Sequence, residues 1–214
     1  MKRGILTIIF TITCLMMVGV AFQASAEENA DQNSNVLNIN GTLISQEQFS
    51  RELTNELNKN AGESLTEEEL NTKVQKVLDN IIKNELVYQE AQKCGIFVSD
   101  AEINQKFNSE KSKFASEEEY LKANNADEAT RKAEIKRNLA NNRLINQKIV
   151  STITVTDDEI KKYYNDNQDQ FTDKTLEQAQ EGISRIIKLN KAADSYTQLC
   201  ADLKKHAKVE VLIK

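Results

Sequence analysis

Five copies of one short sequence motif constrain the fold of this chain more than any other feature. Each copy reads apolar residue, Ser or Thr, two variable residues, Glu or Gln, and a second apolar residue, at positions 44–49, 65–70, 98–103, 115–120 and 155–160. The hydroxyl can accept a hydrogen bond from the backbone N–H three residues later, the Glu or Gln can reach back, and the apolar pair fixes how the chain enters the helix. Each copy of the motif therefore predicts a helix start. Because the 214 residues include no proline, no residue type forbids long helices between these starts.

Apolar periodicity indicates how far the helices extend. The segment after Ser45 carries an apolar stripe at spacing four, and Gly62 is placed to end it. The segment after Thr66 has the longest stripe, which follows a three-four rhythm over residues 70–86 and stops at Gly95. Further helices are expected after Ser99, from Ser116 to a break at 125–127, across the apolar positions 135–149, and from 176 to 203. Residues 152–155 are expected to be extended.

Two segments at opposite ends of the sequence have the pattern of strands. Residues 36–41 run into a glycine turn at Gly41, which delivers the chain to the helix start at Ser45, and residues 208–213 alternate apolar and polar side chains.

The first 26 residues have the composition of a secretory signal peptide. Lys2 and Arg3 precede an apolar run over residues 5–22, and the small residues 24–26 follow it. We expect cleavage after Ala26. The competing interpretation is an uncleaved anchor, since the run is at the lower limit of membrane-spanning length. The remainder divides into a polar leader over 27–35, expected to be disordered, and one domain over 36–214.

Charge argues against two classes of partner. Loss of residues 1–26 removes two positive charges and no negative one, so the net charge changes from −5 to −7. A chain this acidic lacks the basic footprint that nucleic acids or anionic membranes require. The locally basic segment 131–148 is expected to be a solvated helix face.

Residues suited to catalysis or to holding a cofactor are scarce. The one histidine, His206, stands beside two lysines near a helix end, and no glycine-rich phosphate loop or zinc-type spacing of Cys and His occurs. The acidic triplets 67–69 and 117–119 occupy first helical turns, where the helix dipole favours negative charge. We therefore expect no cofactor and no metal. Cys94 and Cys200 are either bridged or two buried thiols.

A longer similarity connects two of the helix starts. Ser99 is followed by Ile103, Phe107 and Phe114 at offsets four, eight and fifteen, and Thr156 is followed at the same offsets by the residues Ile160, Tyr164 and Phe171.

Three segments together resemble the N-terminal chaperone module of the SurA, PrsA and trigger-factor-like proteins. They are residues 36–49, residues 78–100 with the sequence LDNIIKNELVYQEA at their start, and residues 155–171 with the paired tyrosines Tyr163 and Tyr164. The resemblance covers about Val36 to Phe171, and residues 203–211 resemble the closing helix and strand of the family. It implies a mainly α fold, a multi-helix body with a small two-stranded sheet formed by the N- and C-terminal strands. Two isolated strands need such a partner, since an unpaired strand exposes backbone donors and acceptors.

One domain that many proteins of this family contain has no counterpart in the resemblance. In many such proteins a parvulin-type prolyl isomerase domain follows the position of Phe171, whereas here 43 residues remain, without the histidines and glycine-rich turns of that domain. The sequence is similar to the chaperone module alone.

The function that this resemblance implies is a periplasmic, ATP-independent holdase, not an enzyme, for unfolded secreted or outer-membrane polypeptides, with no stable membrane insertion after signal cleavage. One alternative is a helical envelope adaptor or structural protein that binds one folded partner; a less favoured one is an active prolyl isomerase. Clients are expected to bind through partly exposed aromatic rings beside helix boundaries. The candidate residues are Phe107, Phe114, Tyr120, Tyr163, Tyr164 and Phe171. The three phenylalanines are explained equally well as core residues, whereas a tyrosine hydroxyl tolerates a solvated crevice.

Overall fold

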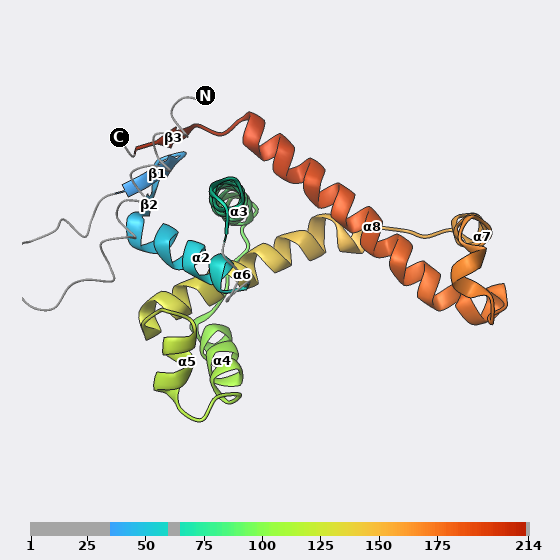
Figure 1. The fold of residues 1–214 in the computed structure, drawn as a ribbon, viewed down its shortest axis with the longest axis horizontal. Helices are drawn as coiled ribbons and strands as arrows, with labels where there is room; N and C mark the ends of the chain where they lie inside the picture. The colour runs from blue at the N-terminus through green and yellow to red at the C-terminus, as the bar shows by residue number, and fades with distance from the viewer. Residues whose placement is uncertain (1–34, 60–64, 213–214) are drawn as a thin grey trace, which may run out of the picture. The chain divides into compact units, whose positions relative to one another are not determined.

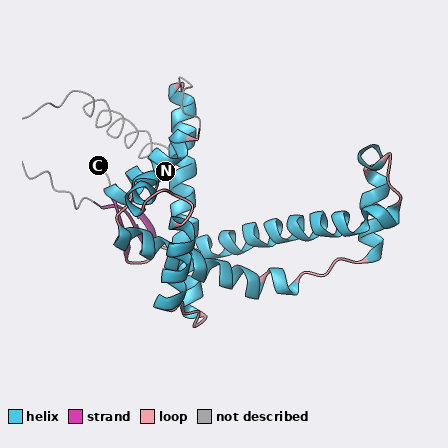
Figure 2. Cartoon of the chain, turned by 90° about the horizontal axis from the view of Figure 1, so that it is seen from below, coloured by secondary structure: helices cyan, strands magenta, loops and turns pink. Residues whose placement is uncertain are grey.

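The computed structural model describes residues 35–59 and 65–212 (Figure 1). In chain order the elements are β1 (Asn35–Ile39), β2 (Thr42–Ser45), α2 (Gln46–Asn58), α3 (Glu67–Lys93), α4 (Asp100–Lys111), α5 (Glu117–Ala123), α6 (Glu128–Lys148), the 3-10 turn η2 (Val150–Thr152), α7 (Asp157–Asp166), the 3-10 turn η3 (Gln168–Phe171), α8 (Leu176–Lys205) and β3 (Val209–Val211). The expectation of a mainly helical chain is confirmed (Figure 2). The expected signal peptide, the expected leader up to residue 34 and the expected helix end at Gly62 lie outside the described residues.

All five expected helix starts are present. At Thr66, Ser99 and Thr156 the hydrogen bonds are reciprocal: the hydroxyl accepts from the third backbone N–H, and the glutamate there accepts from the backbone N–H of the capping residue. Ser45 and Ser116 cap α2 and α5 through the hydroxyl. A sixth, reciprocal cap begins α8 at Thr175. The sequence around Thr175 does not match the motif that occurs five times, because Lys174 occupies the position of the first apolar residue of that motif.

The chain divides into two compact units. The first comprises the described parts of 1–86, 108–131 and 207–214, and the second comprises 87–107 and 132–206. The first contains the sheet, in which β1 pairs antiparallel with β3, as the sequence predicts.

The sheet has three strands in the order β2-β1-β3, so the expectation of two strands is wrong. Asn40 (φ 54°) and Gly41 (φ 93°) form a tight reversal, and residue Thr42 then pairs with Ile39. A two-residue Asn-Gly turn with positive φ at both positions suits a hairpin. The residues between this turn and the cap at Ser45 are therefore a strand and not a loop.

The sheet, α2 and the N-terminal part of α3 supply most of the buried residues of the first unit. The most deeply buried apolar residues among them include Leu37, Ile39, Ile44, Phe49, Leu53 and Ile81. Glu56 is also buried, and its carboxylate binds Lys59 and Lys76 at 2.6 Å each. Hydrogen bonds from these two ammonium groups lower the pKa of Glu56 to about 2.

The second unit contains the same side-chain clamp twice. Arg143 of α6 donates to the Phe97 carbonyl and to the Glu102 carboxylate. Lys191 of α8 donates to the Thr154 carbonyl at 2.9 Å and binds the Glu159 carboxylate at 2.5 Å. In each case the cation binds a carbonyl two residues before the capping residue and the glutamate three residues after it. The sequence similarity after Ser99 and Thr156 is therefore matched by a shared way of fastening α4 and α7.

Candidate functional site

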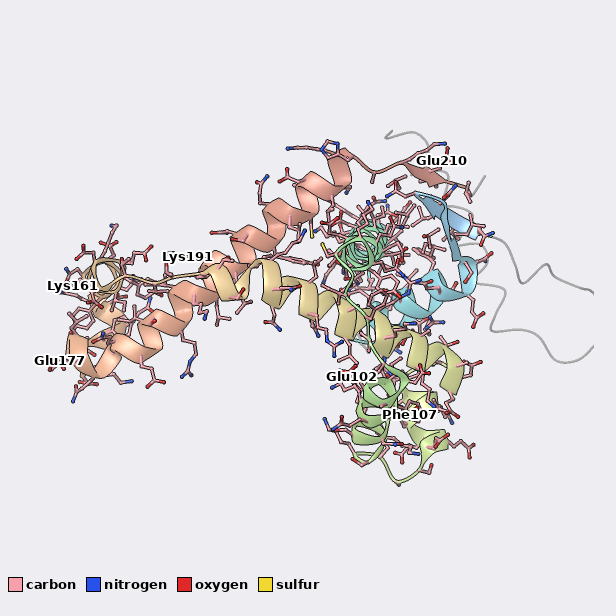
Figure 3. All side chains as sticks on the ribbon, turned by 180° about the vertical axis from the view of Figure 1, so that it is seen from behind. Glu102, Phe107, Lys161, Glu177, Lys191 and Glu210 are labelled. Atoms are coloured by element: carbon pink, nitrogen blue, oxygen red, sulfur yellow. The ribbon has the colours of Figure 1, made fainter. Side chains whose placement is uncertain are left out.

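The hairpin of α7, η3 and α8 carries three of the six candidate residues. Its buried core is small, consisting of Ile160, Ala179 and Ile183. Tyr163, Tyr164 and Phe171 are partly buried and pack against this core. Figure 3 shows the hairpin with Lys161 of α7 and Glu177 of α8 labelled.

The Phe171 ring contacts both tyrosine rings, and we call the three the aromatic cluster. The Phe171 ring stacks on Tyr164 with centroids 5.5 Å apart and meets Tyr163 edge-on at 6.4 Å. The Tyr164 hydroxyl donates to the Lys174 carbonyl at 2.7 Å, which fixes the ring beside the turn into α8. Because all three rings stay partly exposed, the cluster offers aromatic surface to solvent that its own core does not use.

A shallow groove of about 650 Å³ lies on the same hairpin, between the start of α7 and one face of α8. Val155 and Ile160 supply its apolar lining, and both also belong to the packing around the hairpin core. Acidic and basic groups line the rest, among them Asp157, Glu177 and Arg185. The groove and the aromatic cluster thus share Ile160 and its surroundings.

Two candidate residues are in the core instead of at the surface. Tyr120 is 2% exposed and Phe107 is 3% exposed, so the expectation of partly exposed rings is wrong for both. The Tyr120 hydroxyl donates to Glu110 at 2.7 Å and accepts from Arg131 at 2.8 Å, and Arg131 also binds Glu110 at 2.6 Å. Burial raises the pKa of Tyr120, and the hydrogen bond to Glu110 adds to this effect. Because Glu110 and Arg131 provide hydrogen-bond partners for its hydroxyl, Tyr120 can be buried and does not need contact with water.

Phe114 is partly buried and lies against Tyr120, with ring centroids 5.3 Å apart. The structure thus groups Phe114 with Tyr120 in the first unit, and Tyr163 and Tyr164 with Phe171 in the second.

The basic side chains of segment 131–148 remain exposed or partly exposed, as the sequence suggests, and several of them also have partners. Lys148 binds Glu90 at 2.5 Å, and this contact raises the pKa of Lys148 and lowers that of Glu90. Lys132 lies 5.2 Å from the Phe107 ring centroid, and Arg137 lies over a tyrosine ring at 4.8 Å. Charges engaged in this way offer no ready site for an anion.

The remaining reactive groups among the described residues are two cysteines and one histidine. The two described cysteines form no disulfide; Cys94 is exposed and Cys200 is buried, so neither the bridge nor the pair of buried thiols is found. His206 is exposed at the C-cap of α8. Across residues 35–59 and 65–212 no cluster of His, Cys, Asp and Glu suits a metal ion, and no helix has the length and apolarity needed to cross a bilayer.

Several apolar side chains are exposed that the sequence pattern did not predict to be so. Phe97, between α3 and α4, is 82% exposed although the Arg143 clamp holds its carbonyl, and Leu189 of α8 and Val211 of β3 are also exposed. An apolar residue in a short helix connection, such as Phe97 two residues after Gly95, is a signal that could have been noticed.

Sequence comparison places this helical chain in the chaperone and foldase class. It belongs to the SurA-like N-terminal domain family, whose sequence model matches residues 1–145. The hairpin of α7 and α8 lies beyond the matched residues, so its candidate site stands on its own geometry.

Curated relatives have the same name in two organisms. The chain is 25% identical over 187 residues to a protein named foldase protein PrsA from Clostridium botulinum (strain Okra), a match that covers 78% of this chain and 53% of the relative. It is 32% identical over 95 residues to the foldase protein PrsA of Caldanaerobacter subterraneus subsp. tengcongensis, covering 44% and 26%. The chain thus spans about half the length of the relatives that it matches most extensively.

Proposed function

We propose that this chain is an ATP-independent holdase that binds unfolded polypeptides outside the inner membrane and has no isomerase activity of its own. The observation that carries the proposal is the aromatic cluster, in which the Phe171 ring contacts the rings of Tyr163 and Tyr164 and all three remain partly exposed over a small core. Aromatic rings bind varied apolar side chains through large contact areas, and tyrosine hydroxyls tolerate water at the rim. The name foldase, given to the relatives, supports a role in binding polypeptides.

The proposed location follows from the signal peptide. Cleavage after Ala26 would release the chain into the periplasm, where secreted or outer-membrane polypeptides would be its clients. N-terminal sequencing of the protein from the cell envelope should find Glu27 first. An intact segment 1–26 in membranes would instead favour an anchor.

The absence of isomerase activity is proposed from the path of the chain after Phe171. Only residues 172–175 separate η3 from α8, and the Lys174 N–H donates to the Phe171 carbonyl at 3.0 Å within this turn. The resemblance places a parvulin domain after this position. Acceleration of cis-trans isomerisation in a proline-containing peptide by the purified protein would contradict this part of the proposal.

Suppression of aggregation tests the holdase directly. A chemically denatured model protein is diluted with and without the chaperone, and light scattering is recorded. The double variant Tyr163→Ser with Tyr164→Ser should need roughly tenfold more protein for half suppression, equivalent to about 1.4 kcal/mol of binding free energy. Phe97→Ser is the matched control, since it removes a more exposed ring of the same unit outside the cluster, and should act like the wild type.

Two results would contradict the aromatic cluster as the site. One is equal suppression by the double variant and the wild type. The other is an equal loss in Phe97→Ser, which would indicate unspecific apolar contact. A wild-type protein that suppresses no client while it captures one folded partner would favour the adaptor alternative.

A further inference from the structure

The outer edge of β3 carries backbone groups that have no partner among the described residues. The N–H of Asn40 donates to the Lys208 carbonyl at 2.9 Å, and the N–H of Leu212 donates to the Val36 carbonyl at 3.0 Å. In an antiparallel pair, hydrogen-bonded residues alternate with residues whose N–H and C=O point the other way. Given the register of Ile39 with Val209 and of Leu37 with Val211, the two valines direct their backbone groups away from β1. No described residue pairs with them.

Apolar side chains accompany this edge. Val211 is 48% exposed although its partner Leu37 is buried, and Leu212, which follows the strand, is 41% exposed. A strand placed beside β3 would pair with the free backbone groups and could cover the exposed half of Val211.

The charges near this edge are already compensated. Lys208 binds Glu210 at 2.9 Å, and the Asn38 side chain donates to the same carboxylate group at 3.1 Å (Glu210 is labelled in Figure 3). Projecting charges commonly protect edge strands against pairing with other chains. Here the charges of Lys208 and Glu210 neutralise each other, so they would not repel an incoming strand.

The opposite edge of the sheet is a poorer candidate. In β2 the backbone groups of Thr42 and Ile44 face β1, and Ser45 caps α2. In β2, therefore, only Leu43 directs its backbone N–H and C=O away from β1. In β3 two residues, Val209 and Val211, direct four backbone groups outward at the spacing of an extended chain.

We propose that the outer edge of β3 binds one extended segment of an unfolded polypeptide by strand addition. Backbone pairing suits clients of many sequences, because its hydrogen bonds do not depend on side-chain identity, and apolar residues of the segment would contact Val211 and Leu212. The inference rests on the proposed holdase function only for the source of the segment. It is a contact additional to the aromatic cluster.

A pair of proline variants tests this edge. Val211→Pro removes an outward N–H and leaves the bonds to β1 in place, as prolines at sheet edges do. Glu210→Pro removes an N–H that faces β1 and is the matched control. The probe is a fluorescent synthetic peptide in which valine and threonine alternate between terminal lysines, measured by anisotropy. Val211→Pro should bind it at least tenfold more weakly with a melting temperature near that of the wild type, whereas Glu210→Pro should melt earlier. Wild-type affinity in folded Val211→Pro would overturn the proposal.

Changes in the peptide provide a second test, which uses the wild-type protein and does not depend on how the variants fold. Methylation of alternate backbone nitrogens leaves one complete hydrogen-bonding edge, so this peptide should still bind. Methylation of every backbone nitrogen removes both edges and should abolish binding; unchanged affinity would overturn strand addition.

Two further measurements separate this inference from its alternatives. Peptide affinity should be unchanged in the Tyr163→Ser, Tyr164→Ser variant, so a failed aggregation assay would not by itself affect the edge proposal. If the peptide does not bind and Val211→Pro converts a dimer to a monomer in sedimentation, the occupant is a second copy of the chain and the client proposal is wrong.

Discussion

Asn40 and Lys208, 168 residues apart in sequence, are joined by two hydrogen bonds. The backbone N–H of Asn40 donates to the Lys208 carbonyl at 2.9 Å, and the N–H of Lys208 donates to the Asn40 side-chain oxygen at 2.8 Å. The tight turn at Asn40 and Gly41 thus fastens the connection between α8 and β3. This contact sets the register in which β3 meets β1.

Deletion of residues 209–214 should destabilise the first unit, because β1 loses a partner and Leu37 and Ile39 lose cover. With Val211 half exposed, the loss should be about 2–4 kcal/mol, which corresponds to a fall in melting temperature of roughly 5–15 °C. Circular dichroism melting measures it. Leu212→Ser, a change at an exposed position, is the control and should melt close to the wild type. An unchanged melting temperature in the truncated protein would show that β3 contributes nothing to the core.

The helix starts were predictable because capping is local chemistry. A hydroxyl and a glutamate three residues apart satisfy the first backbone donors without help from distant parts of the chain, as at Thr66, Ser99 and Thr156. The pairing of the terminal strands was predictable for a related reason, since each strand needed a partner. β2 was missed because its existence depends on the positive φ of Asn40, which made four residues after the turn a strand.

The candidate site was predicted less well, since exposure depends on neighbours that are distant in sequence. Tyr120 is buried because Glu110 and Arg131 satisfy its hydroxyl, and Phe107 is buried with Lys132 over its ring. Neither relationship follows from periodicity. Tyr164 resembles Phe107 in its offset from a helix start, yet it packs against a much smaller core and stays partly exposed.

Glu56 should make stability depend on pH at acidic values. Its folded-state pKa of about 2 lies below the ordinary value of 4.5 because Lys59 and Lys76 donate to it. Because the folded-state pKa is lowered, the Glu56 carboxylate adds to the free energy of unfolding at pH values above its unfolded-state pKa. This contribution is lost as the pH falls from about 4.5 through about 2. Both lysines are largely exposed, so Glu56→Gln should cost only about 1–2 kcal/mol at pH 7. Urea unfolding at several pH values measures it, and a deficit equally large at pH 2 would contradict the assignment.

Cys94 and Cys200 should differ in reactivity. Cys94 is exposed and Cys200 is buried, so a thiol reagent added to native protein beginning at Glu27 should label Cys94 quickly and Cys200 only on unfolding. Peptide mapping after brief labelling identifies the site, and Cys94→Ser is the control that should leave the native protein unlabelled. Two unreactive thiols in the denatured, unreduced protein would instead indicate a bridge.

Lys191 should hold the start of α7 in place. Its ammonium group binds the Glu159 carboxylate at 2.5 Å and the Thr154 carbonyl at 2.9 Å, and this contact with Lys191 is the main cause of the lowered pKa of Glu159. Lys191→Met retains the apolar stem and removes both interactions. The first turn of α7 should then open more often, which would raise the hydrogen-exchange rate of the Ile160 amide several-fold.

Lys188 provides a matched control on the same helix, since it forms no ion pair with any described residue. Lys188→Met should leave the exchange rate at Ile160 unchanged. The second copy of the clamp gives a parallel test, because Arg143→Met should raise exchange at Ile103 of α4 and not at Ile160. If Lys191→Met and Lys188→Met show the same exchange rate at Ile160, the capping hydrogen bonds of Thr156 and the apolar core are sufficient to fasten α7, and the clamp makes no measurable contribution.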